Sequence, residues 1–276
     1  MRRYLQFILI ALLVTACSSF RNAGHIATIN VPMPAGEAAQ LTLHFGAAEQ
    51  FQLAAGASSL IEGTVQYNDD QLQPQVMTSG SSVTIAQAVR SSMFPSTGLG
   101  NMWNLKLSGA IPLQLTVEAG AYTGSYDLGG LRLRAITVTQ GAAQTAYDFS
   151  TPNTEPMEQL SVASGASELR MAHLANANAA TMHFALAAGS NTLDFGGRLL
   201  RNAHVEISSG AGDLILRVPN TTPMRVTVTG GLSDVQALGF DHHDEQHYVN
   251  AAWDDTRPHF EVTIDGAVGS IHLESV

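Results

Sequence analysis

Residues 113–235 contain pairs of short runs in which apolar and polar residues alternate, and a glycine separates the two runs of each pair. Alternation with a period of two is typical of half-buried β-strands, and Val, Ile, Leu and Phe fill the apolar positions. The separating glycines recur at intervals of 20 to 24 residues, at positions 120, 141, 165, 189, 210 and 230. Such a period is typical of a solenoid, in which each coil buries its apolar side chains only by stacking on its neighbours.

The same unit also occurs outside this region. Residues 41–53 hold an early copy, and residues 260–273 hold a last one, which we expect to cap the C-terminal end. The array contains no convincing amphipathic helix. Two or three short strands in each coil favour parallel stacking. The sequence therefore predicts an all-β fold, a β-solenoid built as a single-stranded, parallel β-helix-like stack of 20–24-residue coils.

The chain divides into four predicted segments. Residues 88–102 interrupt the alternation with Pro95, Gly98 and Gly100, so we place a boundary at residue 102. Trp103 follows and is expected to open the regular array and cover its first coil. The predicted segments are a signal peptide (1–16), a lipidated tether (17–36), an N-terminal β portion (37–102) and a solenoid array with its C-terminal cap (103–276).

The first residues predict export. Arg2 and Arg3 form a basic head, and the apolar run of residues 5–14 is too short to span a bilayer as a helix, as in a secretory signal. The following Val14-Thr15-Ala16-Cys17 resembles the lipobox of bacterial lipoproteins at every position, and Cys17 is the only cysteine. The resemblance implies cleavage before Cys17 and lipidation of its thiol, so the predicted partner is the membrane.

The lipid anchor and the next residue set the expected location. One short acyl chain binds a bilayer only marginally, so stable anchoring needs two or three chains. The residue after Cys17 is Ser18 and not aspartate. By the sorting rule of lipoproteins this favours the outer membrane if the cell has one, and otherwise the cell membrane. The protein is then an extracytoplasmic, membrane-anchored lipoprotein.

Charge excludes one class of partner. Without Arg2 and Arg3 the chain has 11 basic residues against 23 acidic ones, a net charge of about −12. An acidic surface without a basic cluster repels phosphate backbones, so nucleic acid is not an expected partner. A Gly-x-Ser-x-Gly elbow, a phosphate loop and a complete dinucleotide fingerprint are absent from the sequence. We therefore predict no cofactor.

The strand-and-glycine pattern resembles the toast-rack and adhesin-type β-solenoid domains of bacterial envelope proteins. The matching stretches are residues 103–107, 117–121, 140–142, 164–167 and 266–269. The resemblance implies that residues 37–87 are the toast-rack portion and residues 103–276 the solenoid. Some relatives are linked to cell-envelope stress sensing of the LiaF type, but this sequence lacks their several membrane helices.

Two sets of side chains could carry chemistry. On a strand, His243, Glu245 and His247 would point to one side, and imidazole and carboxylate both bind zinc. Their order is not that of the zinc-protease motif, and the alternative is an exposed polar loop, so we predict no metal. The second set flanks inward apolar residues in successive coils and consists of Asp127, Asp148, Arg170 and Asp194.

In a parallel stack this second set would form a surface charge column with a spacing of about 4.8 Å. Asp127 and Asp148 could then act as the acid and base of a glycoside hydrolase. The alternative is a solvated charge ladder in which Arg170 neutralises its neighbours. We favour the ladder because no aromatic subsite platform accompanies the column. We therefore predict no catalytic residues and no enzyme activity.

Together these observations predict a lipid-anchored, non-enzymatic envelope protein that presents a β-solenoid surface for adhesion, scaffolding or assembly. One alternative is an envelope polysaccharide-modifying enzyme that uses Asp127 and Asp148. The other is a regulatory module in the cell-envelope stress response. A groove over the charge column would favour the enzyme, and a face of threonine and serine would favour the binding module.

Overall fold

The computed structural model describes residues 24–88, 100–244 and 246–276. Within this part the fold is all-β, and fifteen strands belong to one sheet, accompanied by two short 3₁₀ turns, η1 (Asp70–Leu72) and η2 (Leu174–Ala177). The strands are β1 (His25–Val31), β2 (Ala39–Ala55), β3 (Ile61–Tyr67), β4 (Gln75–Ser79), β5 (Ser82–Ala86), β6 (Met102–Leu107), β7 (Leu113–Asp127), β8 (Leu133–Asp148), β9 (Met157–Ala172), β10 (Ala179–Asp194), β11 (Ala203–Val218), β12 (Met224–Leu238), β13 (Phe240–His242), β14 (His247–Asn250) and β15 (Phe260–Ser275).

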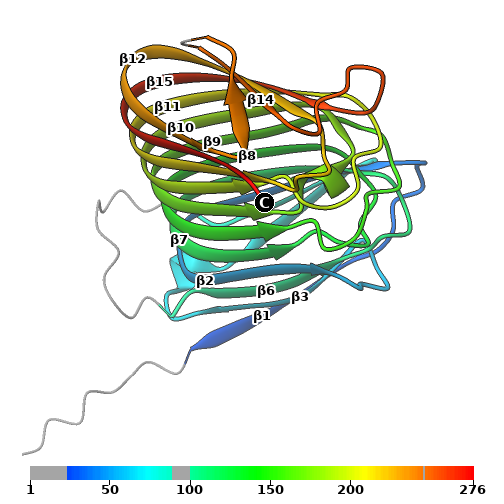
Figure 1. Cartoon of the computed structure of the whole chain (residues 1–276). Helices are drawn as coiled ribbons and strands as arrows, with labels where there is room; N and C mark the ends of the chain where they lie inside the picture. Colours follow the sequence, from blue (N-terminus) through cyan, green and yellow to red (C-terminus); the bar gives the residue numbers. More distant parts are fainter. Residues whose placement is uncertain (1–23, 89–99, 245) are drawn as a thin grey trace, which may run out of the picture.

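Eight long strands form the body of the molecule. They pair in parallel in the order β2, β7, β8, β9, β10, β11, β15, β12. Each bends sharply near its middle, so that the stacked strands enclose a core between their first and second halves (Figure 1). Inward side chains alternate with outward ones along both halves, as in β8, where Ile136, Val138 and Tyr147 are buried. The predicted parallel β-solenoid fold is confirmed.

The repeated glycines lie at the bends and not in turns between separate strands. The strand registers align Gly46, Gly120, Gly141 and Gly165 in successive coils, followed by Ala187 in β10. Gly189 therefore lies two residues beyond the position that the sequence period assigned to it. A Cβ at Gly141 would lie 2.8 Å from the carbonyl oxygen of Gly120, which belongs to the preceding coil. Glycine is required there because the neighbouring backbone is close.

The N-terminal strands cap the array and are continuous with it. The outer edge of β2 pairs with β5 along its first half and with β6 along its second half. Antiparallel β4 extends β5, and antiparallel β3 and β1 extend β6. The array thus begins at β2, so the predicted boundary at residue 102 does not divide the fold. Trp103 lies in β6 and covers the first coil, with its ring 5.2 Å from Phe45 and 6.0 Å from Phe51.

The C-terminal strand is not the cap. β15 lies between β11 and β12, and β12 closes this end together with the β13–β14 hairpin (Figure 1). Apolar size accounts for part of this arrangement. The position that holds Leu216 in β11 holds Leu273 in β15 but Ala237 in β12. Full burial of a leucine contributes about 1.5–3 kcal/mol, so the strand with larger apolar side chains gains more from two neighbours.

The side opposite the bends is made of connecting loops, where buried asparagines replace strand pairing. Asn153, in the β8–β9 loop, is 3% exposed. Its side-chain nitrogen donates to the carbonyl oxygens of Leu133 (2.7 Å) and Ala177 (3.2 Å), and its oxygen accepts from the Leu133 amide (3.1 Å). Asn176 and Asn250 serve other loops in the same way. These amides satisfy backbone groups that would otherwise be buried without partners.

Candidate functional site

The bent strands present two outward surfaces. The first-half face consists of the outward side chains that precede the bends, and the second-half face of those that follow them. Because the strands are in register, each outward position forms a column that crosses the whole stack at about 4.8 Å per strand. The two faces differ in chemistry.

The first-half face is built mainly from small polar side chains. One column contains Thr42, Thr116, Thr137, Ser161, His183, Glu206, Thr263 and Thr227, in stacking order. The next column toward the bend contains His44, Glu118, Thr139, Ala163, Ala185, Ser208, Asp265 and Thr229. Hydroxyl groups thus recur at regular spacing over several coils. This is the threonine and serine face that the binding-module interpretation requires.

Three histidine–glutamate contacts cross this face between neighbouring strands. The Nδ1 atoms of His44 and His183 lie 2.9 Å and 3.0 Å from carboxylate oxygens of Glu118 and Glu206, respectively. His204 lies 3.4 Å from Glu261, which also contacts Arg225. These exposed contacts hold side chains in place across strands and add little stability.

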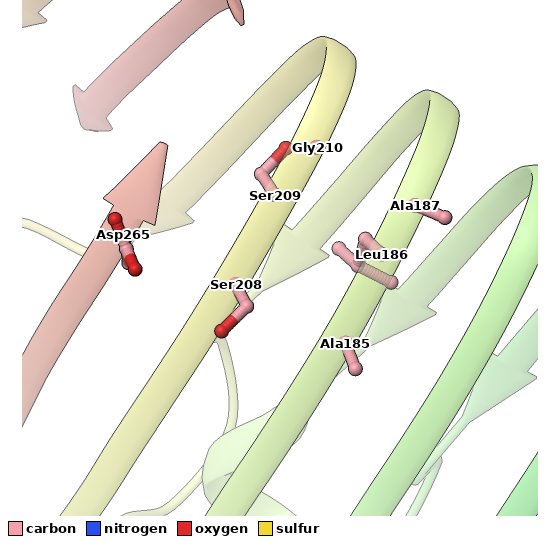
Figure 2. A pocket seen from close by; sticks show the side chains of 7 residues that line it. All are labelled: Ala185, Leu186, Ala187, Ser208, Ser209, Gly210 and Asp265. Carbon is pink, nitrogen blue, oxygen red and sulfur yellow. The ribbon is translucent and has the colours of Figure 1, made fainter. Parts of the chain in front are cut away.

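Two open hollows mark the edge of the first-half face beside the bends. One, of about 310 Å³, is lined by Ala185, Leu186, Ala187, Ser208, Ser209, Gly210 and Asp265, and Figure 2 shows it. The other, of about 350 Å³, includes His44, Glu118 and Thr139 among its lining residues. Small side chains and partly exposed glycines line these hollows. A protruding partner segment could therefore contact the backbone there.

The second-half face carries the predicted charge column, but its register differs at one position. Asp148 lies opposite Asp127 on one side and Ala172 on the other, whereas Arg170 lies opposite Ala146. The distance from the bend explains the error. Asp127 and Asp148 each follow their bend glycine by seven residues, and Arg170 follows Gly165 by only five. Arg170 forms an ion pair with Glu168 at 2.7 Å and does not lie between two column aspartates.

The remaining column aspartates have local partners. Asp127 accepts hydrogen bonds from the Ser150 hydroxyl (2.7 Å) and the Gly129 amide (3.1 Å). Asp148 lies 2.7 Å from Nδ1 of His173. Asp194 accepts from the Gly196 amide at 2.8 Å and lies opposite Arg217. These carboxylates therefore serve turns and neighbouring loops.

A hollow of about 320 Å³ is present on the second-half face, but it is displaced from the column. Its lining residues are Thr123, Gly124, Gln144, Thr145, Ala146, Glu168 and Arg170. Asp127, Asp148 and Asp194 are not among them. This hollow is therefore not the groove over paired aspartates that the hydrolase interpretation requires.

The histidine-rich segment forms the connection between β13 and β14. Asp244 Oδ1 accepts a hydrogen bond from the backbone amide of Gln246 and lies 2.6 Å from Nδ1 of His247. These two contacts, the first above all, hold the pKa of the Asp244 carboxyl below its usual value. His243 donates its amide to the His247 carbonyl oxygen. Glu245 lies outside the described residues. Within the described ranges, no three histidine, cysteine, aspartate or glutamate side chains are grouped to bind a metal ion.

Cys17, the predicted lipidation site, also lies outside the described residues. From residue 24 onward, in the parts that the structure covers, there is no helix with the length and apolar character needed to cross a membrane.

The sequence did not reveal a buried polar cluster inside the bends of β7 and β8. The hydroxyls of Tyr122 and Tyr147 donate to the Gln140 side-chain oxygen at 2.8 Å and 3.1 Å, and Gln140 donates to Ser164 at 3.0 Å. The Tyr147 ring stacks on that of Tyr126 at 4.2 Å. Burial raises the pKa of all three tyrosines. Gln140 is a polar residue at an inward position, and that was the available signal.

Comparison with known proteins places this geometry in a family. Residues 22–158 match the family model described as the N-terminal domain of toast_rack, DUF2154. The chain carries a toast-rack N-terminal domain. The match continues past residue 102 and ends at the start of β9. This agrees with a toast-rack array that is continuous from β2 into β8.

One solved structure shares the fold over nearly the whole length of both chains. A "putative cell adhesion protein" from Clostridium sporogenes has 19% identity and a TM-score of 0.51, covering 92% of this chain and 99% of that one. A "putative adhesin" from Bacteroides fragilis has 11% identity and a TM-score of 0.41, covering 90% and 96%. A search of curated proteins found no match.

The corrected register predicts which charges are coupled. Arg217 in β11 donates to Glu274 in β15 at 2.7 Å, although 57 residues separate them. A double-mutant cycle with Arg217→Met and Glu274→Gln, measured by urea unfolding at low salt, should give a coupling of about 0.2–1 kcal/mol. The matched cycle with Arg170→Met and Asp148→Asn should give none. Coupling in the second cycle and not in the first would contradict the register.

Proposed function

We propose that this toast-rack protein is a lipid-anchored, non-enzymatic protein of the bacterial envelope that binds a partner through its first-half face. The single observation that carries the proposal is the regular array of hydroxyl-bearing side chains on that face, repeated in register over several coils. Such an array offers many equivalent weak contacts to an extended surface. Adhesion or assembly uses contacts of this kind, whereas catalysis needs a few convergent groups in a concave site.

The proposal of a non-enzymatic role rests on the second-half face. Two neighbouring carboxylates, Asp127 and Asp148, are the best candidates for acid–base chemistry. Ser150, Gly129 and His173 engage them through local hydrogen bonds, and the nearby hollow does not include them. The similarity to a "putative cell adhesion protein" agrees with a binding role but shows only the fold.

The proposed location rests on the lipobox, Val14 to Cys17, and on Ser18 after it. We place the protein on the extracytoplasmic side, in the outer membrane if the cell has one and otherwise on the cell membrane. The segment between Cys17 and β1 is short, so the first strands of the array would lie near the membrane. The first-half face would then run away from the membrane along the stack.

Replacing Cys17 with serine tests the anchor. The variant should accumulate as an unprocessed precursor and incorporate no labelled palmitate, because the serine hydroxyl is not the thiol that receives the lipid. Gel mobility and palmitate labelling in the producing bacterium measure both effects. A variant that is still cleaved after Ala16 and still acylated would remove the lipoprotein assignment.

Charge placed on the first-half face tests the binding surface. Thr137→Glu combined with Thr139→Glu should weaken binding of the mature polypeptide (residues 17–276, with Cys17→Ser to omit the lipid) to isolated bacterial envelopes by about tenfold or more, the effect of losing about 1.4 kcal/mol. Both residues are exposed in β8, so folding should be retained. The matched control is Thr123→Glu with Ser125→Glu, two exposed residues of the second-half face. Equal binding by both double variants would contradict the proposal.

A further inference from the structure

The order of the last two long strands departs from their order in the sequence. β12 follows β11 after a short loop, yet β15 lies between them and pairs in parallel with both. Because β12 and β15 share one register, each position of β11 faces a β15 residue that in turn faces a β12 residue. β12 could therefore pair with β11 in the same register as β15 does. The two registers also give the β12 residue that each β11 residue would face.

The observed order, with β15 inserted between β11 and β12 (the inserted order), gives three polar side chains of β11 complementary partners on β15. His204 contacts Glu261, and Arg217 donates to Glu274. Asp213 accepts a hydrogen bond from the Ser270 hydroxyl. Each of these three β11 side chains thus has a suitable partner on β15.

In the alternative order β11–β12–β15, called the sequential order, these contacts would be lost and unfavourable ones would form. At the equivalent positions of β12, His204 would face Arg225, and Asp213 would face Asp234. Like charges directly opposite on neighbouring strands are destabilising. Arg217 would face Leu238 and lose its carboxylate partner. The charges of β11 therefore distinguish the two candidate neighbours.

The β13–β14 hairpin also bears on the choice. β14 pairs with the outer edge of β12 at residues 225–227, and the Asn250 side chain accepts the Met224 amide at 3.0 Å. In the sequential order β15 would need this outer edge, so β14 would have to leave it. β14 covers only the first half of that edge, which leaves residues 229–238 of β12 without a neighbouring strand on that side in the described part.

We propose that β12 and β15 can stack on β11 in two orders, and that His204, Asp213 and Arg217 of β11 select the inserted one. The selection is a conformational device at one end of the array. In the inserted order the array presents the second half of β12 as its terminal strand edge. In the sequential order it would present the edge of β15. The device thus sets which strand a partner would meet at this end.

Disulfide trapping in the mature polypeptide without its lipid, with Cys17→Ser as background, distinguishes the two orders. Ser208 faces Asp265 of β15, which in turn faces Thr229 of β12. A Ser208→Cys, Asp265→Cys pair should therefore oxidise in the inserted order. A Ser208→Cys, Thr229→Cys pair should oxidise in the sequential order only. Reversing the selecting charges with His204→Glu, Asp213→Arg and Arg217→Glu should raise the ratio of the second disulfide to the first by about tenfold or more.

The matched control is Glu206→Lys on β11, which reverses a charge that faces Thr263 of β15 in the inserted order and would face Thr227 of β12 in the sequential order. It should leave the disulfide ratio unchanged. A folded charge-reversed variant with the ratio of the parent would overturn the proposal. If that variant does not fold, Asp213→Arg alone should still raise the ratio, because it would attract Asp234. An unchanged ratio in this single variant would overturn the proposal as well.

Discussion

Valine at Gly189 should destabilise the protein by about 4 kcal/mol or more, enough to leave little folded protein. Gly189 has a φ of +125°, and a Cβ built on it would lie 1.8 Å from the carbonyl oxygen of Ser167 in the preceding coil. The substitution therefore combines a strained backbone with a collision against a backbone that is fixed by strand pairing. Neither can relax without opening the β9–β10 ladder. Urea unfolding monitored by circular dichroism measures the effect.

Two other glycines provide a graded comparison. Valine at Gly141, which has no positive φ but would approach the Gly120 oxygen to 2.8 Å, should cost about 1–3 kcal/mol. Alanine at Gly80 should cost only about 1–2 kcal/mol, because its φ is +60° but no atom lies within 4 Å of the added Cβ. Equal unfolding midpoints for all three variants would contradict close backbone approach at the bends.

Leucine at Asn153 should cost about 3–5 kcal/mol of unfolding free energy, because leucine keeps the approximate size but removes every side-chain hydrogen bond. The amide and carbonyl of Leu133, the carbonyl of Ala177 and the amide of Glu155 would lose their bonds to this side chain. They lie on the loop side of the solenoid, where no strand pairing can replace the lost bonds.

Asn220 is the matched control for this substitution. It lies in the loop between β11 and β12, and it is exposed. Its backbone N–H, which leucine would keep, donates to the Val276 carbonyl oxygen. Leucine there should change the unfolding free energy by less than about 0.5 kcal/mol. If Asn153→Leu and Asn220→Leu have the same urea midpoint, the loop side is not held by buried asparagine.

Alternation and glycine spacing were sufficient to predict the strands, the parallel stacking and the existence of a repeated bend. They could not predict the register beyond each bend, because that depends on the number of residues counted from the bend. Leu169 and Met171 flank Arg170 as Tyr126 and Leu128 flank Asp127, so local alternation favoured a wrong alignment.

The strand order at the two ends of the array was also beyond a local pattern. Nothing within residues 260–273 indicates that this strand enters between two earlier ones, since its pattern equals that of any other coil. The order depends on competition between β12 and β15 for β11. Similarly, the outer edge of β2 is shared by β5 and β6, which a reading along the chain cannot show.

The buried asparagines were missed for a different reason. Polar residues in loops normally face water, and Asn153 or Asn176 in the sequence resembles any other loop asparagine. Their burial follows from the stacking of loops on one another, since each bonds to backbone groups of a neighbouring coil. The candidate binding face, by contrast, follows directly from alternation once the coils are stacked.

The most direct test of the account measures binding and hydrolysis together on one panel of envelope glycans. The mature polypeptide and its Asp127→Asn, Asp148→Asn double variant should bind the same components of isolated envelopes, and neither should release reducing ends. This result follows if the first-half face binds and the paired carboxylates only hold turns. Release of reducing ends by the unaltered protein, and its loss in the double variant, would contradict the central claim that this solenoid binds without catalysing.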